Sequence, residues 1–302
     1  MTERIPAILN VKSGTAADAR EALESSGAFE VHAVEPDAIG STIGEVVGEG
    51  AERVLVSGGD GTIATAATAL LETRAELAIL PGGTLNHFAR DLGISTVADE
   101  ALELAVQGQS RGVDVGLVNG RVFLNTSSVG AYVRFVRIRE RLERRFGYRL
   151  ASALAALRIL FQWSSYAVEL EVDGEPRVYR TPLVFLGVGE REMQVPTLGS
   201  RVKGGRRGLH VMVVRGRSRA RLLAIALAAV ARGVDAVART PELDAFLVDR
   251  CRISLRRPTR VALDGELESM QETLEYELRR DALHVVCPPA EQEEKPSEAL
   301  SA

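Results

Sequence analysis

The sequence predicts two domains: an α/β N-terminal domain with a parallel sheet and a mainly antiparallel β C-terminal domain. In the first part of the chain, short apolar segments alternate with helical segments, which is typical of parallel βαβ units. Later, apolar segments follow one another around turn signals such as Asn119-Gly120, which is typical of antiparallel hairpins. We place the two domains at residues 1–122 and 123–288. Residues 289–302 are rich in Glu, Pro and Ser and are expected to form a disordered tail.

The α/β domain is predicted from buried-strand patterns that are followed by helical segments. The strands are expected at Ile5–Leu9, Phe29–Val34, Val54–Val56 and Leu77–Leu80. The helices are expected at Ala16–Ser25, Ser41–Glu49, Thr62–Leu71, Leu85–Leu92 and Thr96–Val106. Because the carboxyl ends of parallel strands meet at one edge of a sheet, the loops after these strands should lie together, where such folds bind ligands.

The β domain is predicted from one hairpin and a series of later strands. The hairpin is expected at Val113–Val118 and Arg121–Asn125. The later strands are expected at Ala167–Val172, Val178–Tyr179, Leu183–Gly187, Leu209–Val214, Arg252–Leu255, Val261–Leu263, Leu274–Leu278 and Ala282–Val286. A helical block is expected from about Val133 to Phe161, and a further helix from about Ser218 to Ala238.

The composition is that of an ordinary globular protein, with 46% hydrophobic and 26% charged residues in a chain of 302. Cys251 and Cys287 are far apart and form no metal-type or redox-type pair, so we expect free thiols in a reducing cytosol. We see no signal peptide, and the longest apolar run, Leu222–Ala231, is too short to span a bilayer. We therefore expect a cytoplasmic protein that contacts membranes only peripherally. The oligomeric state stays open, with a homodimer among the alternatives.

The charge of the chain is unevenly distributed. The net charge is −4, yet residues 1–120 hold 7 Lys and Arg against 18 Asp and Glu, and residues 121–290 carry a net charge of +10. A basic second half favours an anionic partner. The chain has no zinc-finger spacing and no aromatic-basic RNA-binding motif, so we do not expect nucleic acid as the partner. We expect an anionic membrane surface instead. The arginines between Arg134 and Arg149 are the candidate contacts, although the default interpretation of this block is a solvated, salt-bridged helix.

Two glycine-rich runs follow the third and fourth predicted strands. They are Ser-Gly-Gly-Asp-Gly-Thr at Ser57–Thr62 and Pro-Gly-Gly-Thr-Leu-Asn at Pro81–Asn86. A strand, a glycine turn and a helix in succession direct backbone N–H groups and a helix N-terminus at an anion. An aspartate in such a loop would repel bare phosphate, so Asp60 favours a Mg2+-nucleotide. Either run alone could be a simple turn, but two in succession favour a phosphate site.

Four motifs occur in order at plausible spacing. They are Asn10 with Ser13-Gly14, Gly58–Thr62, Pro81–Asn86 with Phe88-Ala89-Arg90, and Asp264-Gly265-Glu266. With them the chain resembles the diacylglycerol kinase catalytic-domain family, which includes bacterial lipid kinases and sphingosine and ceramide kinases, over about residues 5–288. The resemblance implies a Rossmann-like first domain, also similar to NAD kinases. It further implies ATP- and Mg2+-dependent phosphorylation of a lipid hydroxyl, diacylglycerol-like or sphingoid.

The resemblance also implies roles for individual residues. Glu266 would be the catalytic base, Asp60 would hold Mg2+, and Asp264 would be a Mg2+-side or substrate-orienting partner. The nucleotide would be bound by Asn10, Ser13, Gly14, Gly58, Gly59, Asp60, Gly61, Thr62, Gly82, Gly83, Thr84 and Asn86. From the residues alone, a β-turn with a solvated glutamate is the favoured interpretation of Asp264 to Glu266, and the resemblance reverses this; Asp60 also suits a helix cap.

The chain departs from the family pattern at three places. Val11 stands where the family usually has Pro, and His87 where it often has Asp. Arg207-Gly208-Leu209 stands where bacterial members often carry an Asp-Gly-Leu segment that helps bind a structural Mg2+. Because a guanidinium cannot ligate Mg2+, we expect no metal at this loop and expect Arg207 to pair with nearby acids. The departures keep open a non-catalytic nucleotide- or lipid-sensing protein. NAD kinase is a weaker alternative, since it lacks the second glycine run.

Overall fold

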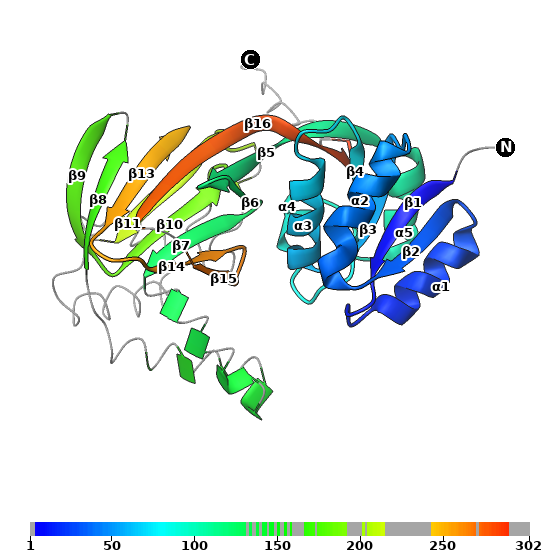
Figure 1. Ribbon diagram of the computed structural model, residues 1–302, viewed down its shortest axis with the longest axis horizontal. Coiled ribbons are helices and arrows are strands. Elements are labelled where there is room, and N and C mark those ends of the chain that lie inside the picture. The colour runs from blue at the N-terminus through cyan, green and yellow to red at the C-terminus, as the bar shows by residue number, and fades with distance from the viewer. Residues whose placement is uncertain are drawn as a thin grey trace, which may run out of the picture.

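The structure is a computed structural model with two lobes, joined by long strands that run from one to the other (Figure 1). It describes residues 4–130, 133–134, 137–138, 141–143, 145–147, 150–151, 154–155, 158, 166–172, 174–191, 201–202, 204–214, 243–269 and 272–289. Where the predicted block at 133–161 is described, its residues up to 158 are helical. The predicted helix at 218–238 and the predicted tail beyond residue 289 lie outside the described residues.

The first lobe is a parallel sheet covered by helices on both faces. Its strand order is β2-β1-β3-β4, and all three pairings within it are parallel. The strands are β1 (Ile5–Asn10), β2 (Phe29–Val34), β3 (Arg53–Gly58) and β4 (Glu76–Pro81). The helices are α1 (Ala16–Ser26), η1 (Pro36–Ala38), α2 (Ile39–Gly48), α3 (Asp60–Leu70), α4 (His87–Asp91) and α5 (Ala98–Gln107).

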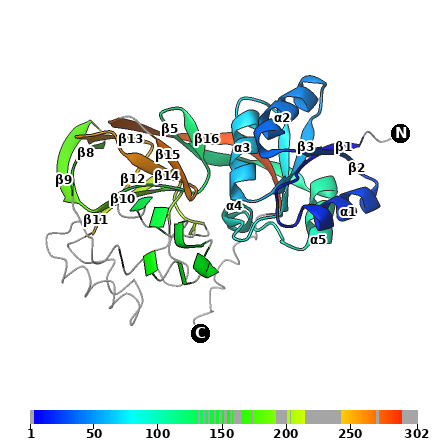
Figure 2. The same ribbon diagram turned by 60° about the horizontal axis from the view of Figure 1, so that its bottom comes forward.

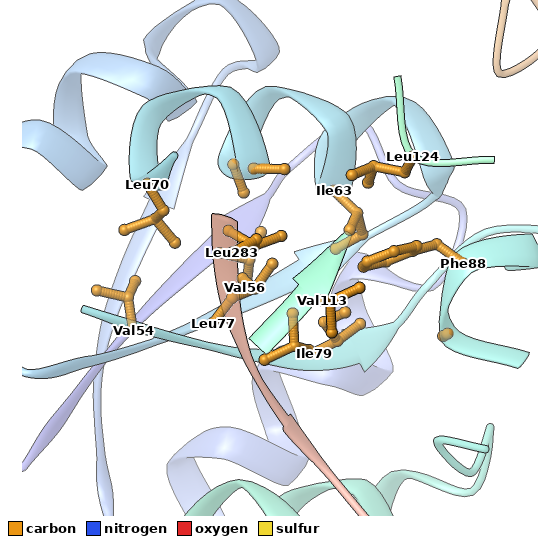
Figure 3. Close-up of a cluster of buried hydrophobic side chains, with 14 of the residues drawn as sticks. Val54, Val56, Ile63, Leu70, Leu77, Ile79, Phe88, Val113, Leu124 and Leu283 are labelled. Carbon is orange, nitrogen blue, oxygen red and sulfur yellow. The ribbon is translucent and has the colours of Figure 1, made fainter. Parts of the chain in front are cut away.

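Alternation along the strands builds two cores in this lobe, because successive side chains of a strand point to opposite faces. On β3, Val54 and Val56 pack with α2, α3 and α4, whereas Leu55 packs with α1 and α5. Figure 3 shows the first of these cores, in which Leu283 lies among the side chains of β3, β4 and α3 although it comes from the far end of the chain.

The second lobe packs an antiparallel sheet against the continuation of the first sheet (Figure 2). The antiparallel sheet has the strand order β12-β11-β10-β7-β14-β15. Its strands are β7 (Thr126–Gly130), β10 (Leu183–Val188), β11 (Leu209–Val214), β12 (Leu243–Val248), β14 (Arg260–Leu263) and β15 (Glu266–Ser269). Apolar side chains fill the core between the two sheets, among them Leu186 and Val211 from one sheet and Leu170 and Ile253 from the other.

One mixed sheet passes through both lobes. It continues from β4 into β16, β13, β8 and β9, and β16 also pairs with β5, which pairs with β6. These strands are β5 (Gln109–Val118), β6 (Arg121–Phe123), β8 (Tyr166–Val172), β9 (Glu175–Thr181), β13 (Arg250–Leu255) and β16 (Thr273–Cys287). The predicted fold class, a parallel α/β part and a mainly antiparallel β part, is confirmed.

One expectation about this sheet needs correction. The strands predicted separately at Leu274–Leu278 and Ala282–Val286 are one strand, β16, whose pairing with β5 shifts between Arg279 and Leu283. Asp281 lies within that irregularity and has a positive φ of 49°. The boundary at residues 122 and 123 stays a prediction, and the end of β16 returns to the core of the first lobe. Among the described residues, no helix is long and apolar enough to cross a bilayer.

Candidate functional site

The loops after β1, β3 and β4 meet at the carboxyl edge of the parallel sheet, as the sequence predicts. Backbone N–H of Gly82 donates to the carbonyl oxygen of Gly58 at 2.8 Å. The Ser13 hydroxyl donates to the carbonyl oxygen of Gly82 at 2.8 Å, and the Asn10 amide donates to the Thr62 hydroxyl at 2.8 Å. Residues from three separate motifs are therefore joined by direct hydrogen bonds.

The two glycine runs touch so closely that side chains would separate them. A Cβ on Gly83 would lie 2.6 Å from the Cα of Gly59, which is backbone and cannot swing away. Asn86 then fixes the second run, since its side chain accepts from Gly83 N–H at 2.8 Å and donates to Gly83 O at 2.7 Å. Asn86 itself has a left-handed φ of 49°, a conformation that asparagine tolerates better than most residues. Gly14 and Thr84 lie exposed on these loops.

Asp60, the aspartate of the first glycine run, is the first residue of α3 and is half-buried. One carboxylate oxygen, Oδ1, accepts the backbone N–H of Phe88 at 3.2 Å, which ties α3 to the start of α4. The helix-capping alternative does not describe it, because α3 has no side-chain cap hydrogen bond. Asp60 lies in the first turn of α3, where the helix dipole favours a negative charge or a bound metal-phosphate group nearby.

Asp264 comes from the turn between β14 and β15 and holds the chain at the start of β7. Its carboxylate accepts backbone N–H groups of Leu124 at 2.7 Å, and of Asn125 and Thr126 at 2.8 Å each. Burial raises the pKa of Asp264, the three backbone donors oppose that shift, and the negative charge of Asp60 adds to it. Both oxygens of Asp264 are thus engaged by the protein, in contrast to Asp60.

Glu266 opens β15 and is exposed, with its side chain lying against the first glycine run. A Cβ on Gly61 would collide with Oε1 of Glu266, so the glycine leaves the room that this carboxylate occupies. Gly61 and Glu266 are distant in the sequence and belong to different lobes. The folded chain therefore brings Glu266, from the fourth motif, next to the residues of the first three motifs.

Arg207 pairs with acids, as expected from the sequence. Its guanidinium donates from Nε to Asp114 Oδ2 at 2.8 Å, also pairs with the other Asp114 oxygen, and lies 2.8 Å from Asp281 Oδ1. Asp114 also accepts the backbone N–H of Asp281 at 3.0 Å. Burial raises the pKa of Asp114, but the Arg207 and Asp281 hydrogen bonds outweigh it and lower the pKa overall. Arg207 therefore ties β5 to the irregularity of β16.

One further charged contact near the site carries no sequence signal. Arg191 NH1 donates to Asp91 Oδ2 at 2.7 Å, across a separation of 100 residues. Asp91 ends α4, and Arg191 follows β10 in the second lobe. Neither residue belongs to a motif, and only the folded chain makes them neighbours.

Comparison with known proteins gives a consistent family. Residues 4–118 match the family described as diacylglycerol kinase catalytic domain. A protein named "Probable lipid kinase YegS-like" from Pseudomonas savastanoi pv. phaseolicola is 42% identical over 90 residues, which is 29% of each chain. The match therefore spans less than a third of that relative. A protein of the same name from Pseudomonas syringae pv. syringae is 29% identical over 262 residues, covering 82% of this chain and 79% of the relative.

Solved structures share the fold over nearly the whole chain. A crystal structure named as a diacylglycerol kinase, from Bacillus anthracis str. Sterne, superimposes with a TM-score of 0.67 at 19% identity, covering 95% of this chain and 98% of the other. A second crystal structure from that organism gives a TM-score of 0.75 at 23% identity with the same coverage. At these identities the likeness is one of fold.

Proposed function

Because residues 4–118 of this chain belong to the diacylglycerol kinase catalytic-domain family, we propose that the protein is a lipid kinase. It transfers the γ-phosphate of ATP to the hydroxyl of a diacylglycerol-like or sphingoid lipid. Relatives are named as lipid kinases and diacylglycerol kinase, which supports the class of reaction but leaves the acceptor open.

The observation that carries the proposal is the contact between Glu266 and Gly61. Phosphoryl transfer needs a positioned phosphate and a group that orients the attacking hydroxyl and takes its proton. The glycine runs and the N-terminus of α3 can hold the phosphates, because their backbone N–H groups lie at one sheet edge. Glu266 supplies the second requirement from the other lobe, at the same edge, as a general base.

Asp60 is the residue best suited to hold Mg2+. Its Oδ1 accepts one backbone N–H, and no hydrogen bond engages its Oδ2 among the described residues. Mg2+ is commonly held by one or two carboxylates together with substrate phosphates, which agrees with finding no group of three ligand side chains in the described part of the chain. Bound Mg2+ would neutralise phosphate charge. Asp264, whose oxygens hold backbone N–H groups, acts instead by fixing the turn that carries Glu266.

The direct test is to incubate the purified protein with labelled ATP, Mg2+ and a total lipid extract, and then to identify the labelled product. A phosphorylated lipid is the expected result, and diacylglycerol, sphingosine and ceramide offered singly would identify the acceptor. Nucleotide binding without any labelled lipid would favour a non-catalytic sensor. Labelled NADP formed from NAD would favour the NAD kinase alternative.

The lipid is reached at the surface of an anionic bilayer, on which the second lobe docks peripherally. Described helical residues of the 133–158 block expose Phe146, Leu150 and Leu154, at 42%, 51% and 37% of their surface. Ala151 and Ala155, which follow Leu150 and Leu154 in the sequence, are buried. Arg145 stacks over Phe146 at 5.6 Å from the ring centroid. Apolar side chains beside arginines are typical of a helix that lies in a membrane interface.

Vesicle co-sedimentation tests this docking separately from catalysis. Binding should rise with the fraction of anionic lipid and fall with added salt, because each basic residue contributes about 1 kcal/mol near the surface. Phe146→Asp should weaken binding roughly tenfold, since a buried Phe is worth about 1.5–3 kcal/mol. Val178→Asp, at a position 75% exposed on β9, is the matched control and should bind normally. Equal losses in both variants, or binding indifferent to lipid charge, would contradict this docking face.

A further inference from the structure

The second lobe contacts the helices of the first lobe at two places on one sheet. Glu266 of β15 lies against Gly61 near the start of α3, and Arg191, just after β10, pairs with Asp91 at the end of α4. Strands β7 and β14 separate β10 from β15 in that sheet, so the two contacts are about 14 Å apart at the usual strand spacing. Both views show α3 and α4 on the side of the first lobe that faces the second (Figure 1, Figure 2).

Two glycines make room for Arg191 and Arg201, one for each, beyond the end of β10. A Cβ on Gly187 would collide with the Cγ of Arg191, and a Cβ on Gly189 would lie 2.5 Å from Nε of Arg201. Arg191 and Arg201 form an isolated antiparallel bridge, and Arg191 N–H also donates to His210 Nδ1 at 3.0 Å. The backbone of Arg191 is thereby fixed, and its side chain is directed back toward the first lobe.

The ion pair between Asp91 and Arg191 is buried, and the charge of Asp91 offsets part of the cost of burying the Arg191 guanidinium. The Arg191 and Asp91 side chains are only 2% and 14% exposed. Burial lowers the pKa of the Arg191 guanidinium, the charge of Asp91 opposes this, and the nearby charge of Arg201 adds to it. Two guanidiniums packed together without an anion would be strongly unfavourable, and removing one partner of a buried pair is costly. Asp91 contributes negative charge to both guanidiniums from the opposite lobe.

Asp91 is linked to the candidate site through a short rigid element. α4 has five residues, about 7.5 Å of helix, and it begins directly after Asn86, which fixes the second glycine run. The N–H of Phe88, within the same helix, binds Asp60. α4 therefore holds Asp91 at a fixed position relative to Asp60 and Gly83, so a residue that binds Asp91 is positioned relative to the glycine runs.

We propose that the Asp91–Arg191 pair sets the angle between the lobes, and so positions Glu266 over the glycine runs for phosphoryl transfer. This inference rests on the proposed function for its catalytic consequence, but not for its structural one. Both residues are positioning residues, because neither contacts the glycine runs directly. The nucleotide cradle lies wholly in the first lobe, so loss of the pair should spare nucleotide binding and lower turnover.

The test uses a double variant, Asp91→Asn with Arg191→Gln, which removes both charges of the pair together. Spin labels on cysteines introduced at Glu21 of α1 and Val178 of β9 report the distance between the lobes, since both positions are exposed and lie at opposite ends of the molecule. The native Cys251 and Cys287 are buried, and burial raises the pKa of both, to about 12 for Cys251, so they should resist labelling.

The unaltered protein should give one narrow distance distribution, and the double variant a broadened or shifted one. The matched control is Glu76→Gln, which weakens a half-buried ion pair with Arg53 that lies within the first lobe, and it should leave the distribution unchanged. In the lipid kinase assay, kcat of the double variant should fall on the order of 10²-fold, as a misplacement of about 1 Å can cause, with the Kd for a fluorescent ATP analogue unchanged.

An unaltered distance distribution in the double variant would overturn the proposal. A changed distribution with normal kcat would overturn the positioning role. If the unaltered protein binds nucleotide and phosphorylates no lipid, the proposed function fails, but the distance measurement still decides whether the pair sets the lobe angle.

Discussion

The two lobes build their sides of the site from different kinds of groups. The first lobe uses neutral groups: backbone N–H and carbonyl groups of the glycine runs, the amides of Asn10 and Asn86, and the hydroxyl of Ser13. Asp60 is the one acidic group of these runs. The second lobe reaches the first with charged side chains, namely Glu266 against Gly61 and Arg191 with Asp91.

This difference predicts a division of labour. A cradle of mutually bonded neutral groups keeps its shape when empty, so it should govern nucleotide affinity, the effect that preorganisation produces. Charged groups brought in from another lobe depend on lobe geometry, so they should govern turnover. Changes on one side of the site should therefore leave the task of the other side intact.

The largest effect is expected for Glu266→Gln. Loss of a general base costs roughly 10²–10⁴-fold in turnover, whereas ATP affinity should stay normal because the base acts on the acceptor hydroxyl. Glu268→Gln is the matched control on the same strand, since Glu268 forms an ion pair with Arg121. Steady-state kinetics measure the turnover, and a nucleotide-binding titration measures the ATP affinity. Equal losses of affinity and turnover would assign Glu266 to the nucleotide cradle and contradict the division.

A loss of roughly a hundredfold or more in turnover is expected for Asp60→Asn. The amide oxygen can still accept the N–H of Phe88, so the fold should survive, but the charge that holds Mg2+ is gone. Asp18→Asn, an acidic residue in the first turn of α1, is the control. Turnover measured across a Mg2+ titration tests this. Near-normal rates at low Mg2+ would mean that the metal is held elsewhere.

A smaller effect, and on affinity, is expected for Gly83→Ala. Its Cβ would lie 2.6 Å from the Cα of Gly59, so the two runs must separate, and overpacking of this kind costs about 1–3 kcal/mol. The nucleotide Kd should therefore rise roughly five- to 150-fold. Gly44→Ala in α2, where a Cβ would meet nothing within 4 Å, is the control. An unchanged Kd would show that the close contact of the runs does not shape the cradle.

The sequence predicts well the part of the site that lies in the first lobe. Local signals define it: short buried strands, glycine turns and helical periodicity lie next to one another along the chain. The expected strand at Phe29–Val34 has the same bounds as β2, and α1 extends the expected helix by one residue, to Ser26. The motif residues of the three loops lie together because parallel strands share one edge.

The part of the site that the second lobe contributes depends on contacts between residues far apart in the chain, which a single sequence does not show. Nothing local marks Asp91 and Arg191 as partners, since each is an ordinary charged residue until β10 and α4 meet. The sequence does not indicate β7, β12 and β15, and β7 in particular carries Ser127 and Ser128 buried at 1% exposure, so it lacks an apolar pattern. The Asp-Gly pair at Asp264 indicates a turn, but nothing local shows what its carboxylate binds, because that carboxylate accepts the distant N–H groups of residues 124–126.

The smallest effect is expected for Arg207, which lies outside the groups that the two lobes contribute to the site, and it concerns stability. Arg207→Met leaves Asp114, which is 2% exposed, without the guanidinium that holds it, and an unsatisfied buried group costs roughly 1–3 kcal/mol. The folded-state pKa of Asp114 is lowered, so its ionisation stabilises the fold above its unfolded pKa of about 3.9 and that contribution is lost as the pH falls through the folded value.

At neutral pH, Arg207→Met should therefore have a lower free energy of unfolding than the unaltered protein. This difference should shrink as the pH falls below about 4. Denaturant titrations at a series of pH values measure it. Arg252→Met, which removes an exposed pairing with Glu275, is the control and should cost less than about 1 kcal/mol. Mn2+ bound at the 207–209 loop, detected by anomalous scattering, would show that the acids there serve a metal instead. A difference that persists undiminished to low pH would mean that Arg207 stabilises the fold by packing, and not through the charge of Asp114.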